Sequence, residues 1–513
     1  MGRARYLARK QFRPAAILST DVTLAALSSM IDLSVMDNAV SAIADSAPGT
    51  QLVVQLRDLS ISKWAGELAA IVLLCPILLS IAIWNGFPII FYDTGAYILE
   101  GLGHVFVPER APVYSLLLYY SGAGVSLWFV AFLQALMTAF VITELARAEL
   151  EDSMQVWKLI AFVMALVIFT GIGWYVGQIE PDIMTAVMVV AIYLLAFRSD
   201  CLGIARTVLL VAIASLAIAS HPAHLALAAG LLLFIALVRV VAIAVSRLRI
   251  GKPALASPFA SLVLAIALVL SANYDLTHKW FISRTGPFFV FARMLQDGLV
   301  QQLLSDTCPK SGYPLCKFKN KLPNRADAWL WDGDSPFNAL NRFHGRVSDY
   351  ERIIADSVTR YPLQNAAAAL KDTALQFVTF KTGDQIEPQE WVLYSDLAHY
   401  VPRQMNSYMR ARQQRGELRF DLLNRIHVSA AIVSLLGLPF LLWVAGLRGD
   451  WRRATLPAFV LIALLGNAFI CGTFSNPHDR YQSRLIWVPF FVLGMLAPRE
   501  RLFSLQRAVE SGT

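Results

Sequence analysis

Charged residues are scarce in this chain. Asp, Glu, Lys and Arg make up only 16% of its 513 residues, whereas 57% are hydrophobic. A soluble domain typically carries about 25% charged residues, so an ordinary soluble enzyme is excluded. Apolar runs of about 18 residues recur along the chain, and a helix needs a run of that length to cross a bilayer. The composition therefore predicts an all-α polytopic membrane protein.

Several widespread sequence signatures are also missing. The chain has no P-loop and no Gly-x-Ser-x-Gly elbow, and Gly171, Gly173 and Gly177 lack the strand–turn–helix context of a dinucleotide fingerprint. The net charge of +8 is not gathered in a basic stripe with interleaved aromatic residues, so a nucleic-acid partner is not expected. The basic residues near the start are not followed at once by an apolar core, which argues against a cleavable signal.

Cysteines are few, and they divide into two kinds. Cys75, Cys201 and Cys471 lie in or beside apolar runs and are expected to act as small packing residues. Cys308 and Cys316 lie in a polar region, separated by a short loop with Pro and Gly, which predicts a disulfide in an oxidising compartment such as a periplasm. Two cysteines are too few for a closed zinc site. No metal site or cofactor is predicted, although the sequence leaves a divalent cation open.

Hydropathy indicates about ten membrane-spanning helices. A further apolar stretch, 112–122, contains Pro112 and is too short to span; it is expected to lie at the interface or to lead into the next span. The ten segments are 65–84, 125–146, 157–175, 182–198, 205–220, 223–244, 255–273, 427–447, 455–473 and 484–498.

Lys and Arg are concentrated in alternate connections between these segments. One connection, for example, holds Arg247, Arg249 and Lys252, whereas 176–181 and 221–224 hold none. Cytoplasmic loops collect Lys and Arg, so the alternation predicts that both ends of the chain are cytoplasmic.

This topology predicts a division of the chain into five regions. They are a cytoplasmic tail at 1–64, seven spans at 65–273 with a first periplasmic loop at 85–124, a mainly helical periplasmic insertion at 274–426, three spans at 427–498 and a cytoplasmic tail at 499–513. Every conspicuous polar cluster then faces the periplasm. Such one-sided clustering is typical of an active site that faces one compartment.

The first periplasmic loop contains a carboxylate, Asp93, that follows an apolar run and precedes a predicted helix. A partly desolvated carboxylate at this place could act as a general base toward a hydroxyl. It could equally cap the helix, because Asp accepts hydrogen bonds from the first free N–H groups.

Two further periplasmic turns carry ionisable residues. Glu180 and Asp182 flank Pro181, and they either favour the positive end of the helix that follows or hold substrate hydroxyl groups. His221 and His224 are three residues apart and can share a helix face. Two histidines alone make no metal site, so a hydrogen-bonding or phosphate-facing role is preferred.

The last periplasmic turn is the most basic one. It holds His478 and Asp479, followed by Arg480 and Arg484 one helical turn apart. Two guanidinium groups at a membrane surface suit a lipid phosphate or pyrophosphate. The alternative is a pair of interfacial arginines that reach the lipid headgroups.

Two short motifs carry a resemblance to a known family. The segments Asp93-Thr-Gly-Ala-Tyr97 and Arg110-Ala-Pro-Val-Tyr114, in a first periplasmic loop, resemble integral-membrane glycosyltransferases of the GT-C fold. That family includes protein O-mannosyltransferases and the aminoarabinose transferases of lipid A. The chain departs from the family in that Thr94 follows Asp93, where an acidic residue is frequent, and in the position of the insertion before the last three spans.

The resemblance implies roles for individual residues. Asp93 would be the catalytic base, and Arg480 and Arg484 would hold a polyprenyl phosphate. The other candidate substrate-binding residues are Tyr97, Arg110, Tyr114, Glu180, Asp182, His221, His224, His478 and Asp479.

The function predicted on this basis is a glycosyltransferase of the bacterial inner membrane. It would move a sugar from a polyprenyl-phosphate carrier to a periplasmic glycan, lipid or protein acceptor, with inversion at the anomeric carbon. The alternatives are an O-antigen ligase or polymerase, a lipid or polysaccharide transporter, and a non-catalytic assembly subunit. A transporter would need polar or broken helices at mid-membrane, yet 65–84, 205–220 and 255–273 contain few charged residues or none.

Overall fold

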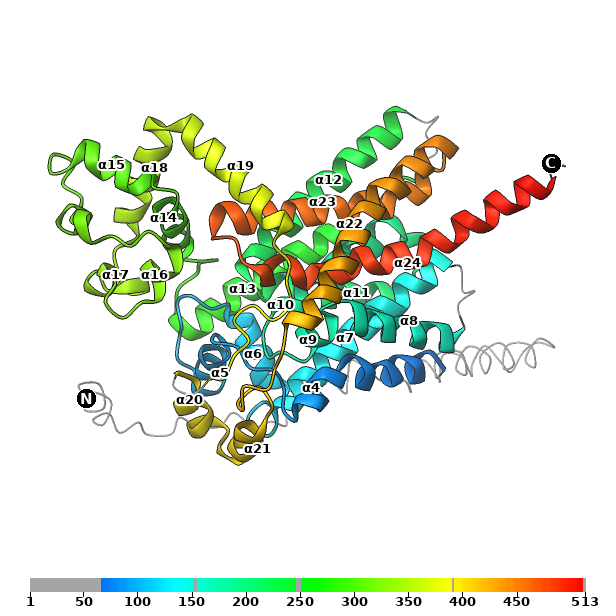
Figure 1. Ribbon diagram of the computed structural model, residues 1–513, viewed down its shortest axis with the longest axis horizontal. Helices are drawn as coiled ribbons and strands as arrows, with labels where there is room; N and C mark the ends of the chain where they lie inside the picture. The colour runs from blue at the N-terminus through cyan, green and yellow to red at the C-terminus, as the bar shows by residue number, and fades with distance from the viewer. Residues whose placement is uncertain (1–65, 151–154, 246–250, 390–391, 511–513) are drawn as a thin grey trace, which may run out of the picture. The chain divides into compact units, whose positions relative to one another are not determined.

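A computed structural model of the chain describes residues 66–150, 155–245, 251–389 and 392–510 (Figure 1). The chain divides into two compact units, Met1–Ala69 and Ala70–Thr513. The second unit holds all of the described residues except the first four of the helix Gly66–Leu78, and the contacts described below lie within that unit. The tail predicted at 1–64 lies outside the described residues.

Each of the ten apolar segments is helical, and most ends differ from the predicted ones by a few residues, whereas the last helix runs twelve residues beyond the predicted end at 498. The first is the helix Gly66–Leu78 followed by α4 (Ser80–Asn85), and the third divides into α8 (Val156–Phe169) and α9 (Ile172–Val176). The others are α7 (Leu127–Leu150), α10 (Asp182–Phe197), α11 (Ile204–Ala219), α12 (Pro222–Ala244), α13 (Ala256–Thr277), α22 (Asp421–Arg448), α23 (Trp451–Phe474) and α24 (Asp479–Glu510). The short stretch at 112–122 forms α6 (Pro112–Tyr120).

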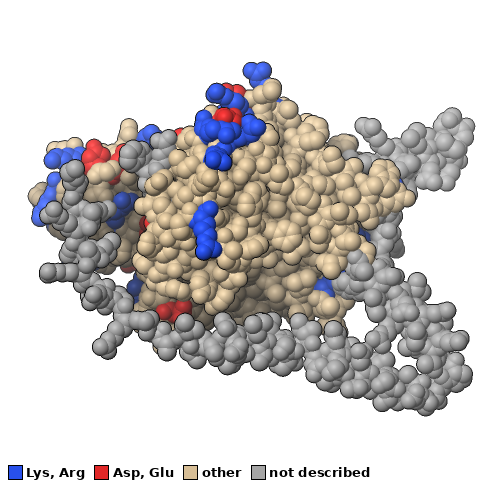
Figure 2. Space-filling view, turned by 90° about the horizontal axis from the view of Figure 1, so that it is seen from below, with Lys and Arg blue, Asp and Glu red and all other residues tan. Residues whose placement is uncertain are grey.

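Five of the described helices, α7, α12, α13, α22 and α23, are long and apolar enough to cross a membrane. Helices α8, α10 and α11 are apolar but shorter. On α12 the large side chains of Leu233, Leu237 and Val240 are exposed, as expected of a helix that faces lipid. Figure 2 shows one face of the molecule that is almost free of charged side chains over its middle. The chain is thus a helical protein of the membrane type.

Helix α10 is the centre of the bundle. It contacts α7, α11, α12, α13, α23 and α24, and its residues from Asp182 to Ala196 are all buried. A helix that is apolar and covered on every side belongs in the interior of a large helical protein. Its N-terminus therefore delivers Asp182 and the preceding Glu180 to a place that other helices surround.

The insertion between α13 and α22 is mainly helical, as predicted. Part of it has a hydrophobic core of its own, built around Phe288, Phe291, Trp329, Tyr350 and Ile353. Its longer elements are α14 (Gly286–Gln296), α15 (Leu299–Thr307), α16 (Ala326–Trp331), α18 (Val347–Arg360), α19 (Pro362–Val378), α20 (Val392–Tyr400) and α21 (Met405–Arg410). The insertion is grouped with the helical bundle in one compact unit.

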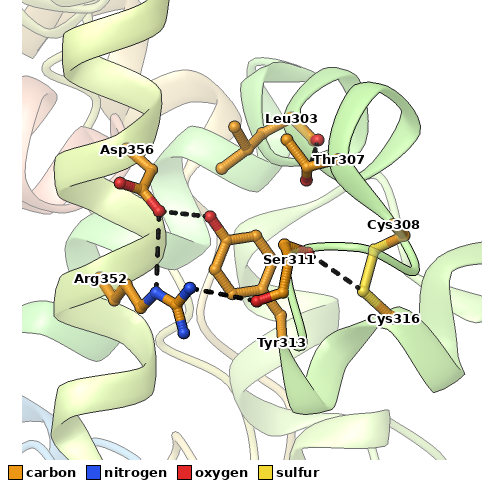
Figure 3. Close-up of a disulfide and its surroundings, with 8 residues drawn as sticks. All are labelled: Leu303, Thr307, Cys308, Ser311, Tyr313, Cys316, Arg352 and Asp356. Carbon is orange, nitrogen blue, oxygen red and sulfur yellow. Dashed lines mark hydrogen bonds and ion pairs between the residues drawn. A yellow bond between two sulfur atoms is a disulfide. The ribbon is translucent and has the colours of Figure 1, made fainter.

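A disulfide closes the loop after α15. The sulfur atoms of Cys308 and Cys316 are 2.09 Å apart, which is the pairing that the loop sequence predicts (Figure 3). Two residues of this loop bond to α18. The carbonyl of Ser311 accepts a hydrogen bond from Arg352 at 3.1 Å, and the hydroxyl of Tyr313 donates one to Asp356. The disulfide loop is therefore fastened to α18.

Candidate functional site

Three segments that are far apart in the sequence meet at one end of α10. The backbone N–H of Ile89 donates to the carbonyl of Gly177 at 2.9 Å, and that of Ile179 donates to the carbonyl of Ile89 at 3.0 Å. From the insertion, the Gln413 side chain accepts from the N–H of Ile90 at 3.0 Å and donates to its carbonyl at 2.6 Å. These backbone contacts fix the first loop against the turn before α10.

Two carboxylates stand at helix starts in this region without capping them. Asp93 occupies the N-cap position of α5 (Thr94–Gly103), yet its side chain makes no capping hydrogen bond. Asp182 is the first residue of α10. Both side chains turn instead toward arginines, so capping does not explain Asp93.

An alternating chain of charges connects these carboxylates to three arginines. Arg110 Nη2 lies 2.5 Å from Asp93 Oδ1, and Arg480 Nη2 lies 3.7 Å from Asp93 Oδ2. Arg480 Nη1 is 4.0 Å from Asp182 Oδ2, while Arg484 Nη1 donates to Asp182 Oδ1 at 2.6 Å. Arg480 thus stands between two carboxylates from different loops. We call Asp93, Asp182, Arg110, Arg480 and Arg484 the arginine cluster.

The arginine cluster is largely buried but not fully bonded. The side chain of Arg484 is only 1% exposed, whereas that of Asp93 is 19% exposed. Among the described residues, the Nε atoms of all three arginines and Asp182 Oδ2 find no hydrogen-bond partner. A buried polar atom without a partner costs about 1–3 kcal/mol, so a ligand that supplies acceptor oxygens to these donors would be stabilised.

Glu180 lies beside the arginine cluster, and its carboxyl differs from those of Asp93 and Asp182 in having no arginine among the described residues bonded to it. Burial, together with the charges of Asp93 and Asp182, raises the pKa of Glu180 well above its ordinary value. Its Oε1 lies 3.3 Å from the hydroxyl of Thr94, which directly follows Asp93. The raised pKa favours the neutral carboxyl of Glu180, and in that state three guanidinium groups face two carboxylates. The site then carries a net positive charge, which suits an anionic ligand.

Aromatic rings surround the arginines. The guanidinium of Arg480 lies over the Phe91 ring at 4.3 Å, and that of Arg110 lies 5.8 Å from Tyr97 and 6.0 Å from Trp331. Trp331 belongs to the insertion and is 41% exposed. Its ring also lies 5.8 Å from the guanidinium of Arg342 and packs against Phe343, so Trp331 brings a partly exposed aromatic side chain of the insertion close to Arg110.

Tyr97 and Tyr114, the two predicted tyrosines, pack against each other beneath the first loop. Their rings meet edge to face with centroids 4.9 Å apart, and both are buried. The hydroxyl of Tyr114 donates to Gln134 Oε1 at 2.7 Å, and Gln134 in turn donates to the carbonyls of Val176 and Gln178. Through Gln134, Tyr114 is thus bonded to the turn before α10. The ring of Tyr97 lies against the guanidinium of Arg110.

The rings of the two predicted histidines are 5.2 Å apart but have different hydrogen-bond partners. His224 is bonded at both ring nitrogens, to the Thr185 hydroxyl at 2.7 Å and the Ala217 carbonyl at 2.8 Å, so it holds helices together. His221 Nδ1 accepts from the N–H of Ala223 at 3.2 Å and caps α12. Burial lowers the pKa of His221, and the nearby charges of His224 and the three arginines lower it further. His221 therefore lies within the electrostatic reach of the arginine cluster.

His478 and Asp479 are placed outside the cluster, at a junction with the insertion. His478 Nε2 lies 3.4 Å from Asp327 and its Nδ1 lies 3.4 Å from Asp384, both residues of the insertion. Asp479 accepts from the N–H of Lys381 at 2.6 Å. Burial alone would lower the pKa of His478, but its hydrogen bonds to Asp327 and Asp384 outweigh burial and raise the pKa to about 10.

Sequence reasoning missed three polar residues that the insertion supplies. Asp327, Asp384 and Gln413 bind the loops of the site, but none stands in a motif that distinguishes it from other polar residues of the insertion. Trp331 did carry a signal, because it stands in the aromatic and acidic stretch Trp-Leu-Trp-Asp-Gly-Asp. Within the described residues there is no group of three or more His, Cys, Asp or Glu that could hold a metal ion.

Comparisons with family models, curated proteins and solved structures found no match to this chain.

Proposed function

We propose that this protein is a membrane-embedded glycosyltransferase that uses a polyprenyl-phosphate-linked sugar as donor. The observation that supports the proposal most directly is the position of Arg480 between Asp93 and Asp182, beside Arg110 and Arg484. This arrangement puts several donors with unmet hydrogen-bonding capacity next to a carboxylate that is partly exposed. A phosphate and a hydroxyl nucleophile are the two groups that such a site would bring together.

The proposed reaction is a single displacement. The acceptor hydroxyl gives its proton to Asp93 Oδ2, which is 3.7 Å from Arg480 and so not tightly held, whereas Arg110 occupies Oδ1. The acceptor oxygen forms a bond to the anomeric carbon as the bond from that carbon to the phosphate oxygen breaks. The phosphate leaves with the electron pair, the anomeric configuration inverts, and the arginines stabilise the added negative charge.

Trp331 and the insertion fit the same proposal. A reaction of this kind must keep water from the donor, because water would otherwise take the place of the acceptor. The insertion contributes Trp331 next to Arg110 and binds the first loop through Gln413. We propose that the insertion covers the sugar while it is transferred.

The finer topology belongs to the proposal as well. We propose ten spans, cytoplasmic ends, a bacterial inner-membrane location and a site that faces the periplasm. The loop-by-loop alternation of Lys and Arg supports this orientation. The resemblance of Asp93-Thr-Gly-Ala-Tyr97 and Arg110-Ala-Pro-Val-Tyr114 to GT-C glycosyltransferases supports the reaction class.

One alternative is favoured by a particular observation. Three arginines in one site would also suit a pyrophosphate, which is the leaving group of an O-antigen ligase or polymerase. The transporter alternative has less support, because the large exposed side chains of α12 are apolar. Ion pairs are buried at both ends of α10, however: Arg484 with Asp182 at its start and Arg198 with Glu149 at its end.

Transfer of labelled sugar in proteoliposomes tests the proposal. Wild-type protein should transfer sugar from a polyprenyl monophosphate donor, and Arg480→Ala should lower kcat by about 10²–10³-fold and raise the KM for the donor. Arg452→Ala is the matched control, since Arg452 is an exposed residue near the start of α23, and it should leave the rate unchanged. Transfer only from a polyprenyl pyrophosphate oligosaccharide would replace the proposal with the ligase or polymerase alternative.

A further inference from the structure

Helix α19 of the insertion is inverted with respect to a helix of a soluble domain. Its buried residues are Asn365, Asp372 and Gln376, all of them polar. Its most exposed large side chains are Leu363, Leu370 and Val378, which are 83%, 70% and 62% exposed. In water, a helix buries its apolar face and exposes its polar one.

The polar residues of α19 are buried because they have partners in the protein. Asn365 donates to the carbonyls of Ser357 and Tyr361 at 3.2 and 3.0 Å. Gln376 donates to the carbonyl of His478 at 2.8 Å and accepts from its N–H at 2.9 Å. The orientation of α19 is therefore set by specific hydrogen bonds, and these bonds turn its other face outward.

The outward face is a continuous apolar stripe. Leu363, Ala367, Leu370, Ala374 and Val378 are all exposed, and they recur at intervals of four, three, four and four residues. Side chains with this spacing lie on one side of an α-helix. Over four turns the stripe contains no charged residue.

The position of α19 indicates what covers this stripe. It packs along α23, which is long and apolar enough to cross a membrane. The contact lies near the end of α23, where a side chain added at Gly472 would meet the Asp372 carbonyl oxygen at 2.6 Å. On α23 itself, Phe469 and Phe474 are exposed close to this contact. The stripe is therefore carried by a helix that packs against a helix of the membrane-spanning type, close to exposed aromatic side chains of that helix.

We propose that α19 is an interfacial helix that lies on the membrane, with its apolar stripe inserted among the lipid headgroups and upper acyl chains. Helices of this kind bury their apolar face about 5–10 Å into that boundary. Lys371 flanks the stripe, and its side chain is 69% exposed although its ammonium also lies 3.6 Å from Asp297 Oδ1. Since Gln376 binds His478, the lipid contact would hold the insertion at the membrane beside the arginine cluster.

Site-directed spin labelling of the full-length protein tests this proposal. Single cysteines would be introduced at Leu363, Leu370 and Ala374 in a Cys201→Ser background without reductant, because Cys75 and Cys471 are buried and the disulfide must stay closed. The labelled protein is placed in vesicles of phosphatidylethanolamine and phosphatidylglycerol, and collisions with oxygen and with a water-soluble nickel complex are measured. Two reference positions are exposed Leu233 on α12, for lipid, and exposed Glu351 on α18, for water.

The expected result is that all three labels collide more with oxygen and less with nickel than the label at Glu351, and approach the label at Leu233. Water-like values equal to those at Glu351 would overturn the proposal. Labels that are immobilised and shielded from both reagents would also overturn it, because a protein partner or a second copy would then cover the stripe. The measurement does not depend on catalysis, so its outcome is independent of the proposed reaction.

Discussion

Asp93 has one oxygen that is held and one that a ligand can approach. Arg110 binds Oδ1 at 2.5 Å, whereas the nearest arginine nitrogen to Oδ2 is 3.7 Å away on Arg480. Two different arginines thus orient the carboxylate, and neither closes it off completely. A general base needs this combination of fixed geometry and access.

Replacing Asp93 by Asn tests the role of this second oxygen. Asn keeps the shape of the side chain but removes the proton acceptor, so sugar transfer should fall by about 10²–10⁴-fold. Membrane insertion should survive, because Asp93 makes no capping hydrogen bond and the amide oxygen of Asn can still accept from Arg110. The rate is measured in proteoliposomes, with Glu351→Gln on the exposed side of α18 as control. Full activity of correctly inserted Asp93→Asn protein would remove Asp93 as the base.

His478 allows a prediction about pH. Its pKa is raised to about 10 from an ordinary value near 6.5, so the protonated form is stabilised by folding. That contribution is complete below about pH 6.5 and is lost as the pH rises toward 10. We expect the Tm of wild-type protein in detergent to fall between pH 7 and 10, and the fall to be smaller in His478→Gln.

The control for this prediction is His344→Gln, because His344 is an exposed histidine of the insertion. Its variant should keep the wild-type dependence of Tm on pH. An identical dependence in wild type and His478→Gln would show that the contacts with Asp327 and Asp384 contribute nothing to stability.

At the scale of elements, close helix contacts are made at glycines. A side chain added at Gly173 would meet Ile81 at 2.9 Å, and one added at Gly177 would meet Ala82 at 2.8 Å. Helix α9 can approach α4 only because both positions lack a side chain. The glycines near residue 171, which do not fit a nucleotide fingerprint, therefore have a packing reason.

The contact between α19 and α23 gives a prediction for one of these glycines. A Cβ at Gly472 would lie 2.6 Å from the backbone oxygen of Asp372, and a backbone atom cannot rotate away. Gly472→Ala should lower the free energy of unfolding by about 1–3 kcal/mol, which is the usual effect of overpacking. Thermal unfolding in detergent measures it.

Gly230→Ala is the matched control, since Gly230 lies within α12 and has no atom within 4 Å of an added Cβ. It should be neutral or stabilise by up to about 1 kcal/mol, because Ala favours helix more than Gly does. Equal effects of the two substitutions would mean that the two helices can separate without cost.

The hydropathy of the sequence was sufficient to locate the apolar helices, but it could not tell which helices pack against each other. All ten apolar segments are helical, because an apolar run of this length has few other ways to satisfy its backbone in lipid. The break between α8 and α9 and the central position of α10 could not be predicted. Both depend on which helices pack together, and a hydropathy profile contains no information about partners.

At the scale of the whole molecule, the charge pattern assigned the residues of the arginine cluster to loops on one side of the membrane. Asp93, Arg110, Asp182, Arg480 and Arg484 come from three different loops, and the structure brings all five together. Their pairing could not be predicted, because a topology assigns loops to a side of the membrane without giving distances between them. The topology also could not separate His478 and Asp479 from the arginine cluster. They share a loop with Arg480, yet their side chains bind the insertion.

The orientation of the whole molecule in the membrane is the premise on which the proposed reaction depends. Reporter fusions after residues 200 and 450, in connections rich in Lys and Arg, should give cytoplasmic signals, because such loops are retained there. A fusion near residue 320, just beyond the disulfide between Cys308 and Cys316, should give a periplasmic one. Alkaline phosphatase serves as the periplasmic reporter and green fluorescent protein as the cytoplasmic reporter, both at each position. A cytoplasmic signal at residue 320 would put the insertion and the arginine cluster on the wrong side of the membrane for a periplasmic acceptor.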